Sequence, residues 1–164
     1  MPERETLERA QEDAREGKSP STQAGEFVRE EMDHIREGKH GARSTKQAIA
    51  IGLSKARRAG VKLQRPRKGA ASAQTRSKAS RDLRRGRTRR KPSSTRSRAT
   101  SRALKREGRS AASRRSLSRQ ARQTARTRGS AARRRSAAKA VRTKGGRGRS
   151  QAARKAARTR ARAA

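Results

Sequence analysis

The chain has no cysteine, tryptophan or tyrosine, and its one aromatic residue is Phe27, among 164 residues. Without cysteine it forms no disulfide bond and offers neither a thiol nucleophile nor a zinc-thiolate site. Without aromatic rings it lacks the side chains that single-strand and base-stacking RNA-binding proteins use. A large packed core is also out of reach of this composition.

Acidic residues and long apolar runs are scarce as well. The chain carries 50 Lys and Arg against 13 Asp and Glu, a formal net charge of +37. A compact free chain of this charge repels itself, whereas a polyanion neutralises it, so the composition predicts nucleic acid as the partner. The longest apolar run is AIAIGL at residues 48–53, and the N-terminus is charged from its third residue. We therefore expect no signal peptide and no contact with a membrane.

Charge divides the sequence into two parts. Residues 1–63 have a net charge of +2, and residues 64–164 have a net charge of +35. Large apolar residues concentrate in the first part, and Pro66 and Gly69 discourage a helix that continues across the boundary. The prediction is a mostly disordered chain: a small all-α head at 1–63 and a long, disordered, low-complexity basic tail at 64–164.

Three short helices are expected in the head, at about residues 3–16, 24–37 and 44–59. The first has a sparse apolar stripe, and we expect it to be exposed and frayed. The second has an acidic stripe opposite its apolar side. The third begins at a capping box, in which Ser44 accepts from the amide of Gln47. Phe27, Ile35, Ile49 and Leu53 are predicted to form one cluster between the second and third helices, as a helical hairpin.

The third helix is expected to pack one side on its neighbour, with Gly52 allowing close approach, and to expose Lys46, Arg57 and Arg58 on the other. This pattern leaves two interpretations open. One is a plain helical hairpin, and the other is a helix-turn-helix that reads DNA sequence. The preceding acidic stripe, formed by Glu26, Glu30, Asp33 and Glu37, counts against the second.

No catalytic or cofactor motif is present. The only Gly-Lys-Ser, at residues 17–19, has Glu12 where a phosphate-binding loop requires its first glycine. His34 and His40 are the only histidines; they have no metal-ligand spacing, and we expect them to be solvated at the surface. The adjacent Glu30 and Glu31 lack an apolar pocket that would shift a pKa toward acid-base work. We expect no enzyme, no cofactor and no metal.

The tail repeats itself. AAKAVRTK at 137–144 recurs 16 residues later as ARKAARTR at 153–160. Arginine supplies 30 of the tail's 37 basic residues, and its planar fork can bridge phosphate oxygens and enter a narrow minor groove. With the three basic residues of the third helix, the densest runs supply the expected nucleic-acid contacts: Lys46, Arg57, Arg58, Arg84, Arg85, Arg87, Arg89, Arg90, Lys91, Arg114, Arg115, Arg133, Arg134 and Arg135.

The head, from STQAGEFVREEMDHIREGKHGARSTKQAIAIGLSKARRAG at 21–60, resembles a small family of uncharacterised bacterial domains followed by Ala/Lys/Arg-rich tails. SRALKREGRSAASRRSLSRQ at 101–120 is similar to those tails, which resemble the tails of bacterial linker-histone-like nucleoid proteins. The resemblance implies a bacterial, cytoplasmic, nucleoid-associated protein and identifies no site.

The function expected from the sequence is sequence-independent DNA binding through phosphate neutralisation, with histone-like DNA compaction and DNA favoured over RNA. Two alternatives remain open. One is an RNA-binding or RNA-chaperone protein, because phosphate neutralisation alone does not distinguish the polymers. The other is a regulatory protein whose head binds a protein partner. A head this small could also need a second copy of itself.

Overall fold

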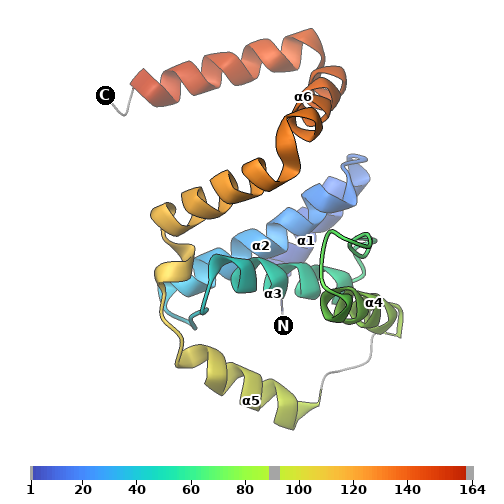
Figure 1. Cartoon of the computed structure of the whole chain (residues 1–164), viewed down its shortest axis with the longest axis vertical. Coiled ribbons are helices and arrows are strands. Elements are labelled where there is room, and N and C mark those ends of the chain that lie inside the picture. Colours follow the sequence, from blue (N-terminus) through green and yellow to red (C-terminus); the bar gives the residue numbers. More distant parts are fainter. Residues whose placement is uncertain (1, 89–92, 162–164) are drawn as a thin grey trace. The chain divides into compact units, whose positions relative to one another are not determined.

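The computed structural model describes residues 2–88 and 93–161, and over these residues the chain forms six α-helices and one 3-10 helix (Figure 1). Contacts divide it into two compact units, residues 1–120 and 121–164. The expectation of a mostly disordered chain is therefore wrong, because helices continue through the segment predicted to be a disordered tail. The head is all-α, as expected, but its compact unit extends to Gln120.

The three helices expected in the head are present as α1 (Arg4–Arg15), α2 (Pro20–Glu37) and α3 (Thr45–Arg58). The second begins four residues earlier than predicted, because Pro20 can occupy the first turn of a helix without losing a hydrogen bond. It ends at Gly38 in the left-handed conformation, with φ of 81°. Ser44 caps α3 as expected and accepts from the Gln47 amide at 3.2 Å. The Gln47 side chain reaches back to the amide of Arg43.

Close packing of α2 on α3 builds the core of the first unit. A Cβ at Gly52 would lie 2.8 Å from the Cα of Val28, so the predicted close approach at this glycine is confirmed. Phe27 and Ile35 are fully buried. They belong to two clusters rather than the single one expected: Ile35 packs with Ile49, and Phe27 packs with Leu53.

The first helix is not the exposed, frayed element that was expected. It packs against α2, and it buries Thr6 and Ala10. Ala10 belongs to the same cluster as Phe27, and Arg9 donates from Nε to Glu26 at 2.9 Å. Small side chains are enough to pack this face of α1 against α2. A prediction based on the number of large apolar residues therefore failed to indicate the contact.

A fourth helix, α4 (Ala73–Thr88), packs against α3 (Figure 1). Its residues Ala79, Asp82 and Gly86 face the contact. Ala79 is 4% exposed, and Asp82 accepts from the Ser54 hydroxyl at 2.6 Å. A Cβ at Gly86 would overlap the carbonyl of Arg57, so the two helices meet with no side chain between them at that point.

After α5 (Ser94–Lys105), a short segment returns to the head and ends in the 3-10 helix η1 (Ser110–Ala112). It is held by hydrogen bonds to its backbone carbonyls. The amides of Gly41 and Ala42, in the α2–α3 loop, donate to the carbonyls of Leu104 at 2.9 Å and Gly108 at 3.1 Å. The Thr45 hydroxyl donates to the carbonyl of Ala111 at 2.6 Å. Residues 104–112, which we call the docked segment, are therefore part of the fold.

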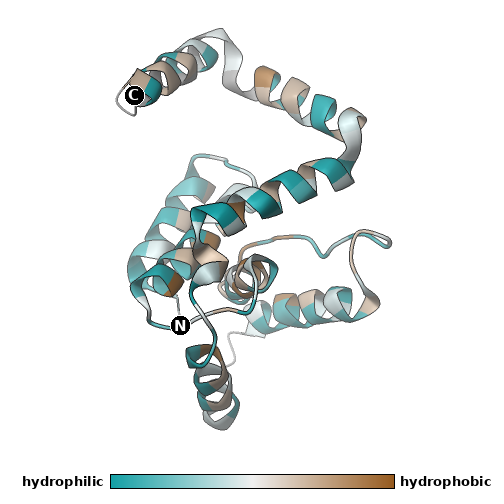
Figure 2. Ribbon diagram, turned by 60° about the vertical axis from the view of Figure 1, so that its left-hand side comes forward, coloured by the Kyte–Doolittle hydropathy of each residue, from teal (hydrophilic) through white to brown (hydrophobic). Residues whose placement is uncertain are grey.

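The last helix, α6 (Arg114–Ala161), is interrupted by two glycines in non-helical conformations, Gly129 and Gly145. It starts in the first unit, where Leu117 packs against the cluster of Ile35, Ala111 and Ala112. In Figure 2 its ribbon is coloured mainly as hydrophilic, with short hydrophobic stretches. Residues 64–88 and 93–120 thus fold with few large apolar residues, by burying Ala79, Ala111 and Ala112 and by accepting backbone hydrogen bonds from the head.

The docked segment depends on the absence of a side chain at Gly41, since a Cβ there would overlap the carbonyl of Glu107. We expect Gly41→Ala to release residues 104–112 and to destabilise the first unit by about 1–3 kcal/mol through the resulting overpacking. Hydrogen exchange of the Ala42 amide and urea unfolding would measure the two effects.

Gly25→Ala provides the matched control. Gly25 lies inside α2, and nothing would lie within 4 Å of its added Cβ. This substitution should stabilise the helix by about 0.5–1 kcal/mol. If the two substitutions had the same effect on stability and on the Ala42 amide, the docking at Gly41 would be wrong.

Candidate nucleic-acid interface

The face of α3 that was expected to be exposed and basic is partly covered by α4, at its C-terminal end. Ser54 and Arg58 both contact Asp82: the hydroxyl at 2.6 Å, and the Arg58 Nε at 3.6 Å from a carboxylate oxygen. This contact with α4 makes the C-terminal part of the face less accessible to a major groove, which counts against the helix-turn-helix interpretation of α3. Of the three α3 residues predicted to bind nucleic acid, Lys46 is exposed and Arg58 is partly exposed.

Arg57 is buried, with 8% of its surface exposed, so the expectation that it lies exposed on α3 is wrong. It donates from Nη1 to the Leu53 carbonyl at 3.4 Å, and its Nε has no hydrogen-bond partner. Desolvation lowers its pKa, an effect that the nearby Asp82 opposes. Arg57 therefore serves the packing of α3 against α4 and is not available to a polyanion.

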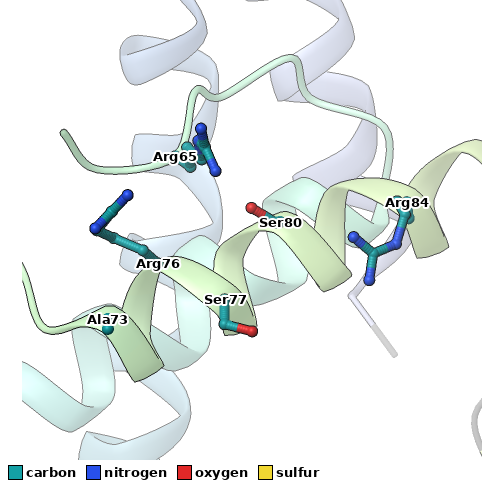
Figure 3. A pocket seen from close by; sticks show the side chains of 6 residues that line it. All are labelled: Arg65, Ala73, Arg76, Ser77, Ser80 and Arg84. Carbon is teal, nitrogen blue, oxygen red and sulfur yellow. The ribbon is translucent and has the colours of Figure 1, made fainter. Parts of the chain in front are cut away.

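A basic hollow lies between α4 and the loop that precedes it. It has a volume of about 310 Å³. Figure 3 shows that Arg65 comes from the loop that passes over α4, whereas the other lining residues come from α4 itself. Those residues follow a helical stripe with small side chains between the arginines: Ala73, Arg76, Ser77, Ser80 and Arg84.

The hollow is suited to an anion. Its polar side chains are guanidinium groups and hydroxyls, and it contains no carboxylate. The Nε of Arg76 is buried without a hydrogen-bond partner. It lies toward the N-terminal half of α4, where the helix dipole favours negative charge. Arg65 and Arg76 were not predicted from the sequence, although the spacing of Arg76, Ser80 and Arg84 in α4 was a readable signal.

The remaining predicted residues of α4 and α6 lie at the surface. Arg85 and Arg87 of α4 are exposed, as is Arg84. Arg114 and Arg115, at the start of α6, are exposed, as are the consecutive Arg133, Arg134 and Arg135. Arg89, Arg90 and Lys91 lie outside the described residues. The structure thus brings Arg84 to the hollow with Arg65 and Arg76, and it places the α6 arginines on a separate element.

The repeat recognised at 137–144 and 153–160 extends to three units of 16 residues, at 113–128, 129–144 and 145–160. Each unit contains six Lys or Arg and no Asp or Glu. The repeat coincides with structure, because Gly129 and Gly145 begin the second and third units and interrupt the helix there. In both units the arginine four residues later donates from Nε to the glycine carbonyl, Arg133 at 3.4 Å and Arg149 at 3.2 Å.

In contrast, two of the four carboxylates in the acidic stripe of α2 pair with cations inside the head. Glu30 is buried and accepts from Lys55 of α3 at 3.2 Å, and Glu26 pairs with Arg9 of α1. Asp33 is half-buried, with 44% of its side chain exposed, and Glu37 is exposed, at 54%. The expected continuous acidic stripe is therefore wrong at its first two positions, since α1 and α3 cover them.

The histidines are partly buried rather than solvated. Their rings form an edge contact with centroids 5.9 Å apart, and 13% and 16% of their side chains are exposed, for His34 and His40. His34 Nε2 lies 2.8 Å from a carboxylate oxygen of Glu3, to which Lys39 also donates at 2.9 Å. The Lys39 and His34 hydrogen bonds lower the pKa of Glu3 to about 2.

Lys55 supplies the positive charge that stabilises the buried carboxylates of Glu30 and Glu31. Its Nζ lies 3.2 Å from Glu30 and 2.8 Å from Glu31, whose side chains are 1% and 0% exposed. Lys55→Met would leave both carboxylates without this cation, and we expect a loss of about 3–5 kcal/mol in the free energy of unfolding. Denaturant unfolding, monitored by circular dichroism, measures this loss of stability.

The control is Lys46→Met, which removes an exposed lysine from the same helix. Its effect should stay within about 0.5 kcal/mol, as for most surface positions. Equal stabilities for the two variants would contradict the buried ion-pair cluster.

The chain was compared with protein families, curated proteins and solved structures. Residues 20–69 match the model of a family of unknown function, DUF6496. No curated protein and no solved structure matches the chain. Within the residues that the structure describes, no helix combines the length and the apolar character that crossing a membrane requires.

The match covers α2, α3, the loop between them and the start of the connection to α4, which is the part of the head that the sequence resemblance identified. The likeness of the tail to those of nucleoid proteins stays a prediction. The chain carries, at residues 20–69, a DUF6496 family domain of unknown function.

Proposed function

We propose that this chain binds duplex DNA without sequence preference, through phosphate contacts made by exposed arginines, and that it acts as a nucleoid-associated protein rather than as an enzyme. The observation that carries the proposal is the repeated basic helix. Every arginine of α6 whose side chain is described is exposed, and the three units it contains hold no acidic residue. Because these units contain no carboxylate of their own, phosphates can neutralise their positive charge.

Duplex DNA is favoured over single-stranded nucleic acid by the position of the only aromatic ring. Phe27 is fully buried in the core of the head. Single-strand binding relies on exposed rings on which bases stack, and this chain has no other aromatic residue. Arginine-rich helices can instead contact the backbone and the minor groove of a duplex.

The repeat also supports compaction. A helical unit of about 15 residues is about 22 Å long, and successive residues point about 100° apart around its axis. Consecutive arginines such as Arg133, Arg134 and Arg135 therefore surround the helix instead of forming one face. Cations on all sides allow one helix to contact two duplexes at once, which is the requirement for bridging DNA.

The basic hollow on α4 adds a second set of contacts from the first unit. Asp82, the only acidic residue of α4, is turned to α3, so the exposed surface of this helix is cationic. Arg65, Arg76 and Ser80 line this hollow and offer hydrogen-bond donors for a backbone phosphate. The α6 repeat supplies most of the charge, and the hollow supplies a fixed contact.

The salt dependence of binding tests the proposal. Replacing Arg133, Arg134 and Arg135 with Gln in the full chain removes three exposed charges. If all three neutralise phosphates, the slope of log K against log salt becomes shallower by about 2.7, at about 0.9 per phosphate. Fluorescence anisotropy with a labelled duplex over a range of salt concentrations measures this slope.

A matched triple variant of the head separates specific contacts from overall charge. Arg4, Arg29 and Arg43 are exposed and outside the proposed interface, and replacing them with Gln removes the same charge. The slope of log K against log salt for this variant should stay close to that of the unmodified protein. Equal changes in both variants, or a several-hundredfold preference for one duplex sequence, would overturn the proposal, and tighter binding to single-stranded RNA than to DNA would favour the RNA alternative.

The hollow has its own test. Arg76→Gln removes the donor with the unpartnered Nε, whereas Lys78→Gln removes an exposed cation of the same helix that does not line the hollow. We expect a loss of about tenfold in duplex affinity for the first, the size of a charge-assisted hydrogen bond, and a smaller loss for the second. Equal losses would show that α4 contributes charge only.

A further inference from the structure

The head holds a group of three potential metal ligands that the sequence spacing did not indicate. Glu31 and His34 come from α2, and His40 comes from the α2–α3 loop. One oxygen of Glu31 and one ring nitrogen of each histidine lie within 4.8 Å of one another. The left-handed turn at Gly38 brings the loop back along the helix, and so it places His40 beside residues six and nine positions earlier in the chain.

Glu31 is the feature of this group that packing does not explain. Its side chain is 0% exposed, and neither of its oxygens has a hydrogen-bond partner. Lys55 Nζ lies 2.8 Å from Oε2, and His40 Nε2 lies 3.3 Å from Oε1, but neither contact has hydrogen-bond geometry. Lys55 is one cation shared between two buried carboxylates, Glu30 and Glu31, and a buried carboxylate without hydrogen bonds is costly unless its charge is fully balanced.

His40 is oriented for such a cation. Its Nδ1 lies 3.1 Å from the carbonyl of Gly41, to which it can donate a hydrogen bond. In the neutral ring this leaves the lone pair on Nε2, which faces Glu31, and a hydrogen bond at the other nitrogen is the usual support of a metal-bound histidine. The 3.3 Å between His40 Nε2 and Glu31 Oε1 matches the edge of a tetrahedron with bonds of about 2.0–2.1 Å.

The charges around the group allow a cation to enter. Lys55 also donates to Glu30 at 3.2 Å, so it keeps a partner when Glu31 binds a metal. Glu3 lies on the other side, with an oxygen 2.8 Å from His34 Nε2 and 2.9 Å from Lys39 Nζ. The surroundings therefore contain three carboxylates, from Glu3, Glu30 and Glu31, against two lysines.

We propose that Glu31, His34 and His40 form a site for a divalent transition-metal ion, with Zn²⁺ as the preferred occupant. Two imidazoles and one carboxylate suit Zn²⁺, whereas Mg²⁺ and Ca²⁺ prefer oxygen ligands throughout. Three protein ligands leave a fourth position for water. The ion would tie α2 to the loop whose next two residues, Gly41 and Ala42, donate to the docked segment. Its role is thus to stabilise the head on which residues 104–112 dock.

The test uses the full chain after treatment with a chelator. Zinc chloride should bind with a stoichiometry of one and should raise the melting temperature by about 5 °C or more at saturation, because it binds only the folded chain. Cobalt chloride should give the visible absorption of a tetrahedral or five-coordinate Co²⁺ site. Magnesium chloride at the same concentration should do neither.

Variants assign the ligands. Glu31→Gln and His40→Gln should each lose at least tenfold in zinc affinity and lose the cobalt spectrum, and having two variants keeps the test valid if one of them does not fold. Glu37→Gln, an exposed carboxylate of the same helix, is the matched control and should retain both. The proposal is overturned if zinc gives no shift, or if the shift is the same in Glu31→Gln, His40→Gln and Glu37→Gln. DNA affinity plays no part in these measurements, so they stand or fall separately from the proposed function.

Discussion

Close approach of one backbone to another, at positions without side chains, is the constraint on which this fold depends. Gly52 brings α3 against α2, Gly86 brings α4 against α3, and Gly41 brings the docked segment against the α2–α3 loop. A chain with so few large apolar residues gains little from each buried side chain. It compensates by packing small residues tightly, where dispersion contacts and backbone hydrogen bonds act together. Further segments of the same chain, α4 and residues 104–112, pack on the small head.

The second organising feature is a partition of charge. The carboxylates of α1 and α2 pair with cations of the head, including Arg9 with Glu26 and Lys55 with Glu30 and Glu31. Asp82 of α4 is directed at α3. What remains on the exposed surfaces of α4 and α6 is almost entirely positive. The fold therefore separates the charges used for stability from those that the proposed binding to DNA uses.

Several local features could be read from the sequence because they depend on residues a few positions apart. The capping box at Ser44, the helix end at Gly38 and the close contact at Gly52 are all present. The errors concern residues whose surroundings come from distant segments. Arg57 looked exposed until α4 covered it, and the histidines looked solvated until Gly38 turned the loop back on α2. The prediction of disorder failed because it counted large apolar residues and overlooked buried alanines such as Ala111 and Ala112.

The sequence by itself determined the helices of the head, the excess of positive charge beyond residue 63 and the 16-residue period of α6, since helix propensity, capping and composition act within a few residues. Only the tertiary structure decided which of the charges are buried. It joined Thr45 to Ala111 and Arg36 to Ala112 across 66 and 76 residues of chain. It also gathered Glu31, His34, His40 and Lys55 into one cluster. Such contacts follow from which faces pack, and a one-dimensional pattern does not specify which distant segment will cover a given face.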